Sequence, residues 1–187
     1  MDADALTGGF VDAPRDSAYA FRALMNVMAR PGTIERLAGA TPPAPLSVAA
    51  GTLLLTLTDP DTPVYLAGAV DTEAVRDWIA FHIGAPLVSA DAAMFACGTW
   101  EALAPIDAYP VGTPAYPDRS ATLIVERDSL EAEGIDLTGP GIREKAALNL
   151  PEQDAFARNA RRFPLGLDFY FTCGDRVAGL PRSTRIG

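Results

Sequence analysis

Apolar residues recur at helical spacing near the start of the chain. Four of them, in residues 15–29, fall at positions i, i+3, i+4 and i+7, which places them on one face of a helix. Pro31 and Gly32 follow directly and cannot continue a helix. The pattern therefore predicts a helix over residues 15–29 with an apolar face that packs on the core. That face consists of Phe21, Leu24, Met25 and Met28.

Three further helices are predicted. Ser47 can cap a helix that runs to about Leu57, although TLLLTLT within it would also fit a buried strand. Asp71 is expected to cap a helix over residues 72–83, and Pro151 to lie in the first turn of a helix in PEQDAFARNARR. In the second of these helices, the residues expected to face inward are Val75, Trp78, Ile79 and His82.

Short apolar runs between the helices predict strands. They are residues 33–37, 64–67, 86–89, 94–98, 121–126, 135–138, 167–174 and 176–181. Helices and strands alternate, and the late strands are apolar throughout, which favours a sheet covered by helices on both faces. The last two strands are joined by a short turn and must pair antiparallel, so we predict an α/β fold with a mixed sheet. We expect one domain over residues 1–187, with residues 1–12 poorly ordered.

Charge and composition narrow the classes of function. The net charge of −9 argues against nucleic-acid binding, which needs clustered Lys and Arg. No apolar run reaches the roughly 20 residues that cross a bilayer, and the N-terminal residues do not resemble a signal peptide, so we expect no membrane contact and a cytoplasmic location. From Pro151 onward, six arginines face four acidic residues. This basic segment indicates either a small anion or acidic partner, or a solvated helix surface.

The sequence lacks the residues that several kinds of cofactor require for binding. A pyridoxal phosphate enzyme needs a lysine in a pocket, and the sole lysine, Lys145, lies in the polar segment IREKAAL. An iron–sulfur cluster needs at least three cysteines on one chain, whereas only Cys97 and Cys173 are present. Two cysteines and one histidine far apart make no zinc pattern, and a disulfide is unexpected in the cytoplasm. We therefore expect no cofactor and no metal.

Other polar residues are interpreted as structural. His82 on an apolar helix face is more often a half-buried, hydrogen-bonded residue than a general base. Gly139-Pro140-Gly141 is expected to form a turn and not a phosphate cradle, because proline has no N–H to donate. Asp59 and Asp61 fit a turn better than a metal site, and Ser183-Thr184 has no base nearby in the sequence.

The segment FPLGLDFYFTCGDRVAGLPRST, residues 163–184, raises the main functional question. Its first strand alternates, with Leu167, Phe169 and Phe171 on one side and Asp168, Tyr170 and Thr172 on the other. Burial of Asp168 would require a partner, and Arg162 or Arg182 could supply one.

Four segments in this order resemble the PhnH family, the H subunit of bacterial carbon–phosphorus lyase. They are RFPLGLDFYFTCGDRVAGLPRST, DTPVYL, the FH-x3-APLVS pattern at residues 81–89 and DLTGPGI; AFRALMNVMARPG also fits. The resemblance implies a three-layer αβα sandwich like the large domain of pyridoxal phosphate-dependent transferases, without the cofactor. It also implies a core complex with G, I and J subunits. We expect a symmetric homodimer in isolation, since a chain without its partner often pairs with itself.

The resemblance implies a role in the breakdown of organic phosphonates. The complex transfers an alkylphosphonate to the ribose C1 of a nucleoside triphosphate and releases adenine. A different subunit, with an iron–sulfur cluster, later cleaves the carbon–phosphorus bond. The resemblance brings no catalytic residue to this chain. We therefore interpret Arg162, Asp168, Arg182 and Arg185 as candidate anion or interface contacts in a subunit that is not catalytic alone.

Two alternatives stay open. The chain could be a stand-alone enzyme on a phosphorylated or phosphonate ligand, with Arg182, Arg185 and Arg162 as an anion clamp that Asp168 orients. It could also be a ligand-binding regulator that uses a remnant of the cofactor pocket. Release of adenine by the purified chain alone would favour the first, and ligand-dependent fluorescence of Trp78 and Trp100 would favour the second.

Overall fold

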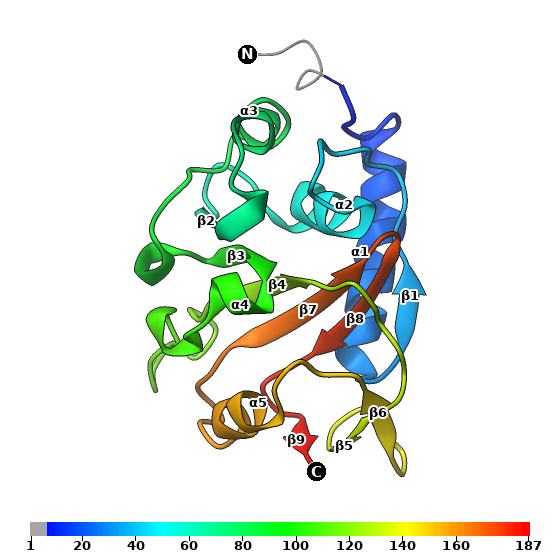
Figure 1. Cartoon of the computed structure of the whole chain (residues 1–187), viewed down its shortest axis with the longest axis vertical. Coiled ribbons are helices and arrows are strands. Elements are labelled where there is room, and N and C mark those ends of the chain that lie inside the picture. The colour runs from blue at the N-terminus through cyan, green and yellow to red at the C-terminus, as the bar shows by residue number, and fades with distance from the viewer. Residues whose placement is uncertain (1–6) are drawn as a thin grey trace.

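The computed structural model describes residues 7–187 and contains a six-stranded mixed sheet with a small second sheet beside it (Figure 1). The helices are α1 (Ala13–Ala29), α2 (Val48–Leu57), α3 (Glu73–His82), α4 (Trp100–Leu103) and α5 (Gln153–Ala160). The strands are β1 (Ile34–Arg36), β2 (Val64–Leu66), β3 (Phe95–Thr99), β4 (Thr122–Glu126), β5 (Ile135–Thr138), β6 (Ala146–Leu148), β7 (Asp168–Cys173), β8 (Arg176–Leu180) and β9 (Arg185–Ile186).

The main sheet has the order β1-β8-β7-β4-β3-β2. Within this sheet, β2, β3, β4 and β7 are parallel to one another. Strand β8 pairs antiparallel with β7, and β1 pairs antiparallel with β8. The register places Thr122 opposite Asp168 and Glu126 opposite Thr172. The predicted mixed sheet and closing hairpin are therefore confirmed.

Helices lie on both faces of this sheet. One core joins α1, α2 and α3 to strand residues such as Ile124 and Tyr170. The other core joins α4, α5 and the small sheet to residues such as Leu123, Phe169 and Phe171. The alternation predicted for β7 is confirmed, because Phe169 and Phe171 enter one core and Tyr170 enters the other. Burial on both faces explains why β4 and β7 are apolar almost throughout.

Helix α1 ends where predicted and begins two residues earlier, and of its predicted apolar face only Leu24 and Met28 pack on the core. The residues it buries are Ala20, Ala23, Leu24 and Val27. Phe21 and Met25 are 50% and 54% exposed, so the prediction that they pack on the core was wrong. The helix approaches the sheet closely at Gly179 of β8: a Cβ added there would lie 2.8 Å from the Met28 sulfur and 2.9 Å from the Met28 nitrogen. A large side chain such as Phe21 cannot fit at that contact.

The remaining helices also depart from prediction in detail. Ser47 caps α2, accepting a hydrogen bond of 3.1 Å from the Ala50 N–H, and the helical alternative for this segment is the observed one. Thr72, not Asp71, caps α3, and Asp71 instead binds Arg76. Helix α5 begins after Pro151, so that proline does not occupy its first turn.

The small sheet has the order β6-β5-β9, and its outer strands were not predicted. Strands β6 and β9 have only three and two residues, too few for a periodic pattern to be visible in the sequence. Residues 86–89, predicted to form a strand, make only an isolated bridge between Leu87 and Val64. Polar and proline residues around that bridge leave the chain without a continuous ladder.

Residues 1–6 of the segment expected to be poorly ordered lie outside the described residues. Of the remainder, the Gly8 carbonyl accepts a hydrogen bond from the Thr41 N–H at 2.9 Å. Among residues 7–187, no helix has the length and apolar character needed to cross a membrane.

Candidate functional site

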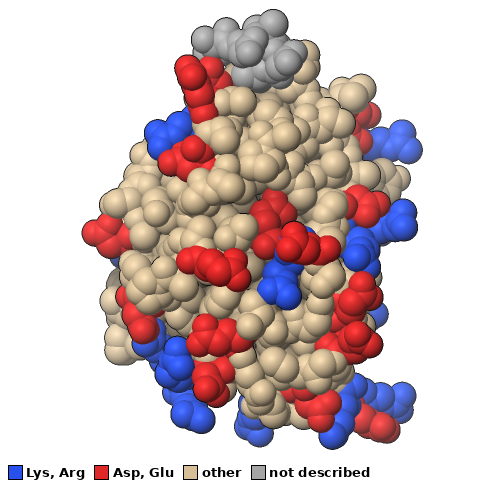
Figure 2. All heavy atoms as spheres, viewed as in Figure 1, with Lys and Arg blue, Asp and Glu red and all other residues tan. Residues whose placement is uncertain are grey.

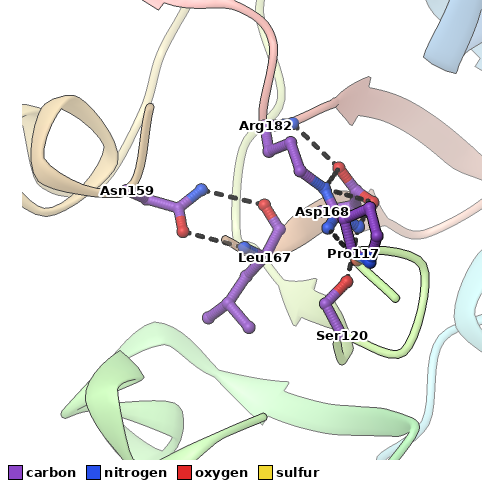
Figure 3. A network of polar contacts seen from close by, with 6 residues as sticks. All are labelled: Pro117, Ser120, Asn159, Leu167, Asp168 and Arg182. Atoms are coloured by element: carbon purple, nitrogen blue, oxygen red, sulfur yellow. Dashed lines mark hydrogen bonds and ion pairs between the residues drawn. The ribbon is translucent and has the colours of Figure 1, made fainter. Parts of the chain in front are cut away.

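Asp168 and Arg182 form the most extensive polar contact in the C-terminal segment (Figure 3). Asp168 opens β7, and Arg182 follows the end of β8, so the hairpin brings the two side chains together. Asp168 Oδ1 accepts hydrogen bonds from the Arg182 backbone N–H at 2.8 Å and from Nε at 3.1 Å. Oδ2 accepts from Nε at 3.2 Å and from Nη2. The prediction that an arginine would partner Asp168 is confirmed, with Arg182 as that residue.

The Arg182 guanidinium also binds the loop that precedes β4. Nη1 donates to the Pro117 carbonyl at 2.6 Å, and Nη2 donates to Ser120 Oγ. We call Asp168, Arg182, Pro117 and Ser120 the Arg182 network. The side chains of Arg182 and Asp168 are only 14% and 20% exposed. Since most of the guanidinium N–H groups bind within the fold, the network ties three chain segments together.

Asn159 makes a second buried contact beside this network (Figure 3). Its side chain, 3% exposed, donates to the Leu167 carbonyl and accepts from the Leu167 N–H, both at 2.8 Å. These two bonds satisfy the backbone N–H and carbonyl of Leu167, the residue before β7, and fix α5 to that strand. No pattern in the sequence predicts this contact, because Asn159 lies among arginines, as on a solvent-exposed helix.

The other two candidate arginines lie apart from the network. Arg162 pairs with Asp107, and both side chains are substantially exposed, at 38% and 61%. Arg185 lies on β9 with an exposed side chain and forms no ion pair within the part of the chain that the structure describes. The structure therefore brings Arg182 and Asp168 together and leaves Arg185 as the available cation.

A half-buried carboxylate that was not predicted from the sequence lies at the carboxyl end of β4. Glu126 accepts hydrogen bonds from the Ser47 N–H at 2.8 Å and from Thr172 Oγ1 at 2.9 Å. Burial raises the pKa of Glu126, and the hydrogen bonds from Ser47 and Thr172 oppose this shift. Ligands often bind at the carboxyl ends of parallel strands, but here the carboxylate holds α2 and β7 against β4. Its position as the last residue of the apolar run ATLIVE was the available signal.

The other polar residues considered in the sequence contact neighbouring groups of the fold. Lys145 is exposed and pairs with Asp136 at 2.9 Å. His82 is half-buried, with Nε2 3.0 Å from the Thr7 carbonyl oxygen. The Asp61 N–H donates to Asp59 Oδ1 at 2.9 Å, as in a turn. Within residues 7–187, no three His, Cys, Asp or Glu side chains are grouped to hold a metal.

The two cysteines lie in different surroundings. Both are free, with Cys97 buried and Cys173 half-buried. Burial raises the pKa of the Cys97 thiol well above its usual range, so its reactive thiolate form is disfavoured. Cys173 Sγ lies 3.4 Å from the Asp128 carbonyl oxygen.

A cleft of about 430 Å³ opens next to the Arg182 network. We call it the C-terminal cleft. The predicted turn at residues 139–141 forms one wall, and Gly141 is required there because an added Cβ would lie 1.8 Å from the Ala29 carbonyl oxygen of α1. Its lining residues are Gly139, Pro140, Ala160, Phe163, Ser183, Thr184 and Arg185.

The fold and its buried contacts define an α/β protein in which the most buried charged groups stabilise strands and loops. Comparison with known proteins gives the family. The family model described as bacterial phosphonate metabolism protein (PhnH) matches residues 8–187. The chain belongs to this family.

Two relatives match along nearly the whole chain. The alpha-D-ribose 1-methylphosphonate 5-triphosphate synthase subunit PhnH of Rhizobium meliloti (strain 1021) is 41% identical, over 96% of this chain and 94% of that protein. The putative C-P lyase subunit protein HtxG of Stutzerimonas stutzeri is 33% identical, over 93% of this chain and 87% of that protein. The family expected from the sequence is therefore confirmed.

Proposed function

We propose that this chain is the H subunit of the carbon–phosphorus lyase core complex. In that role it supports the transfer of an alkylphosphonate to the ribose C1 of a nucleoside triphosphate, with release of adenine. The observation that carries the proposal is the 41% identity to a synthase subunit over 96% of the chain. The partners would be the G, I and J subunits, and the location would be the cytoplasm.

The site geometry favours a supporting role over catalysis by the chain alone. Asp168 and Arg182 bind each other and the loop before β4, so neither is positioned to act as an acid or base on a substrate. The four adjacent parallel strands β2, β3, β4 and β7 of the mixed sheet support the further proposal of kinship with the large domain of pyridoxal phosphate-dependent transferases. The sole lysine is exposed and paired with Asp136, which is unlike a Schiff-base lysine in a pocket.

Assembly requires a contact surface, and the outer side of α1 is both apolar and exposed, as such a surface would be. Five exposed apolar residues repeat there every three or four positions, on the side opposite the buried one. A helix that is apolar on two sides is typical of one buried on both. We call this set the outer α1 stripe and propose that it contacts a second copy in isolation and a partner subunit in the complex. It consists of Pro14, Ala18, Phe21, Met25 and Ala29.

Release of adenine tests the proposed function. The purified chain, mixed with ATP and methylphosphonate, should release no adenine, whereas the assembled G, H, I and J complex should release it. The complex prepared without this chain should lose most of that activity. Turnover by the chain alone would contradict the proposal, as would full activity of the complex that lacks it.

A further inference from the structure

The C-terminal cleft has the size and the chemistry of a ligand site that the subunit role does not require. Its volume of about 430 Å³ falls within the range usual for small-molecule sites. It is enclosed by the turn at residues 139–140, the end of α5 and the segment 183–185. The Arg182 network holds that last segment in place, since Arg182 directly precedes it.

One side of the cleft is apolar. The Phe163 side chain is 61% exposed, although it is a large aromatic group, and Pro140 lines the cleft with it. Exposed aromatic rings serve as platforms on which planar groups, such as nucleobases, stack. A ligand with a flat ring would cover Phe163 and remove its apolar surface from water.

The other side carries hydroxyl groups. Thr184 is 1% exposed, and its Oγ1 has no hydrogen-bond partner within residues 7–187. Ser183 is half-buried and lines the same side. Thr184 Oγ1 is closed to solvent, and therefore also to a ligand in the cleft. Ser183 leaves a half-buried hydroxyl at the cleft surface that can donate a hydrogen bond to a polar group of a ligand.

The charge of the cleft selects an anion. Arg185 lines it, and Arg161 follows Ala160 directly; neither forms an ion pair among the described residues. No acidic residue lines the cleft. Figure 2 shows basic side chains at the lower end of the molecule, where α5 and β9 lie in Figure 1, with acidic groups among them. On a chain of net charge −9, an arginine without an ion-pair partner in a cleft without acidic lining favours an oxyanion there.

The carboxyl end of α5 does not cancel this preference. A helix carries partial negative charge at that end, from carbonyls without partners. Here the last carbonyls of the helix accept hydrogen bonds from the backbone N–H groups of residues 161–163, at 3.0–3.3 Å. The accepting carbonyls are those of Ala157, Asn159 and Ala160. The guanidinium of Arg185 therefore remains the dominant charged group at the cleft.

We infer that the C-terminal cleft binds a nucleoside phosphate. Its base stacks on Phe163, and its phosphate binds Arg185 and the hydroxyl of Ser183. The choice of a nucleotide over other aromatic anions rests on the proposed function, in which a nucleoside triphosphate is consumed. The cleft would hold that nucleotide within the assembly, while the transfer itself takes place on other subunits.

Titration of the purified chain with four probes tests the inference. Calorimetry at low salt should show saturable binding of ATP and AMP. Adenosine lacks the phosphate, and ribose 5-phosphate lacks the base, so each should bind at least about tenfold more weakly. No saturable binding of AMP or ATP would overturn the inference, as would equal binding of all four probes.

Two variants locate the binding. Phe163→Ala and Arg185→Gln should each weaken AMP binding about tenfold or more, and Arg185→Lys should recover part of the loss. Phe81→Ala and Arg22→Gln, which change an exposed phenylalanine and an exposed arginine outside the cleft, should leave binding unchanged. Binding that the two cleft variants do not alter would contradict the inference.

The same cleft variants separate this inference from the proposed function. Both should still co-purify with the G, I and J subunits, because they lie outside the outer α1 stripe. If they co-purify but the unaltered chain binds no nucleotide, the inference fails and the proposed function stands. If the unaltered chain binds AMP but joins no complex, the proposed function fails instead.

Discussion

At the scale of single residues, Asp168 and Arg182 show how a conspicuous charged pair can be structural. The two residues carry the chemistry that an anion site would use, yet they bind each other and the loop before β4. Removing one member of a buried pair leaves the other charged group without its partner, which costs more than the pair itself contributes.

We predict that Asp168→Ala lowers the free energy of unfolding by about 3 kcal/mol, since Arg182 would keep its charge in a largely buried position. Urea unfolding measures this loss. Asp107→Ala is the matched control, because it removes the carboxylate from the exposed Arg162 pair and should cost less than about 1 kcal/mol. Equal losses in the two variants would show that burial of the network contributes nothing.

The half-buried carboxylate of Glu126 gives a prediction about the pH dependence of stability. Burial raises its pKa above the ordinary value of 4.5, so the folded state holds a proton that the unfolded state has lost. In the window from 4.5 up to the raised pKa, the folded state therefore binds more protons, and this group makes the fold less stable as pH rises.

Glu126→Gln removes that dependence while it keeps an oxygen to accept from Ser47. We expect the stability of the variant, relative to the unaltered chain, to be greater at pH 8 than at pH 5. Free energies of unfolding at both pH values measure this difference. A relative stability that stays constant or falls toward pH 8 would contradict the raised pKa.

The sequence predicted only part of this residue-scale picture. An isolated aspartate in an apolar strand requires a partner, so Asp168 could be recognised and its two candidate arginines named. The choice of Arg182 over Arg162 depends on the hairpin register, which places Arg182 beside the start of β7. The contact between Asn159 and Leu167 depends on how α5 ends, and no pattern in the sequence encodes that.

At the scale of secondary-structure elements, α1 is the most informative case. Its ends were predictable, because Pro31-Gly32 stops it, but its inward face was not. Periodicity marked a face of four large side chains, of which Leu24 and Met28 pack on the core, whereas the inward face also includes the small residues Ala20 and Ala23. The large residues Phe21 and Met25 were left outside, where they form the centre of the outer α1 stripe.

We predict that the double variant Phe21→Asp, Met25→Asp is monomeric and does not join the complex, because two carboxylates would be buried at the contact. Sedimentation measures the oligomeric state, and circular dichroism verifies that α1 is intact. Phe81→Asp on α3 is the control, since it changes a phenylalanine of similar exposure, 53%, outside the stripe. A double variant that assembles like the control would exclude the outer α1 stripe as the contact.

At the scale of the whole molecule, the layered mixed sheet followed from alternation of elements and from the apolar strands β4 and β7. The small sheet did not, because β6 and β9 are too short to show a period and depend on pairing with β5. The C-terminal cleft could not be predicted either. It joins residues near 140, 163 and 184, which the fold alone brings together.

The central claim is that this chain works as one subunit of an assembly, and co-purification tests it most directly. The G, I and J subunits, one of them tagged, would be co-expressed with this untagged chain, and the purified material weighed by native mass spectrometry. We expect a complex that contains this chain in a fixed ratio to its partners. A complex of the other subunits that forms without it, while this chain remains unbound, would exclude the role of a subunit.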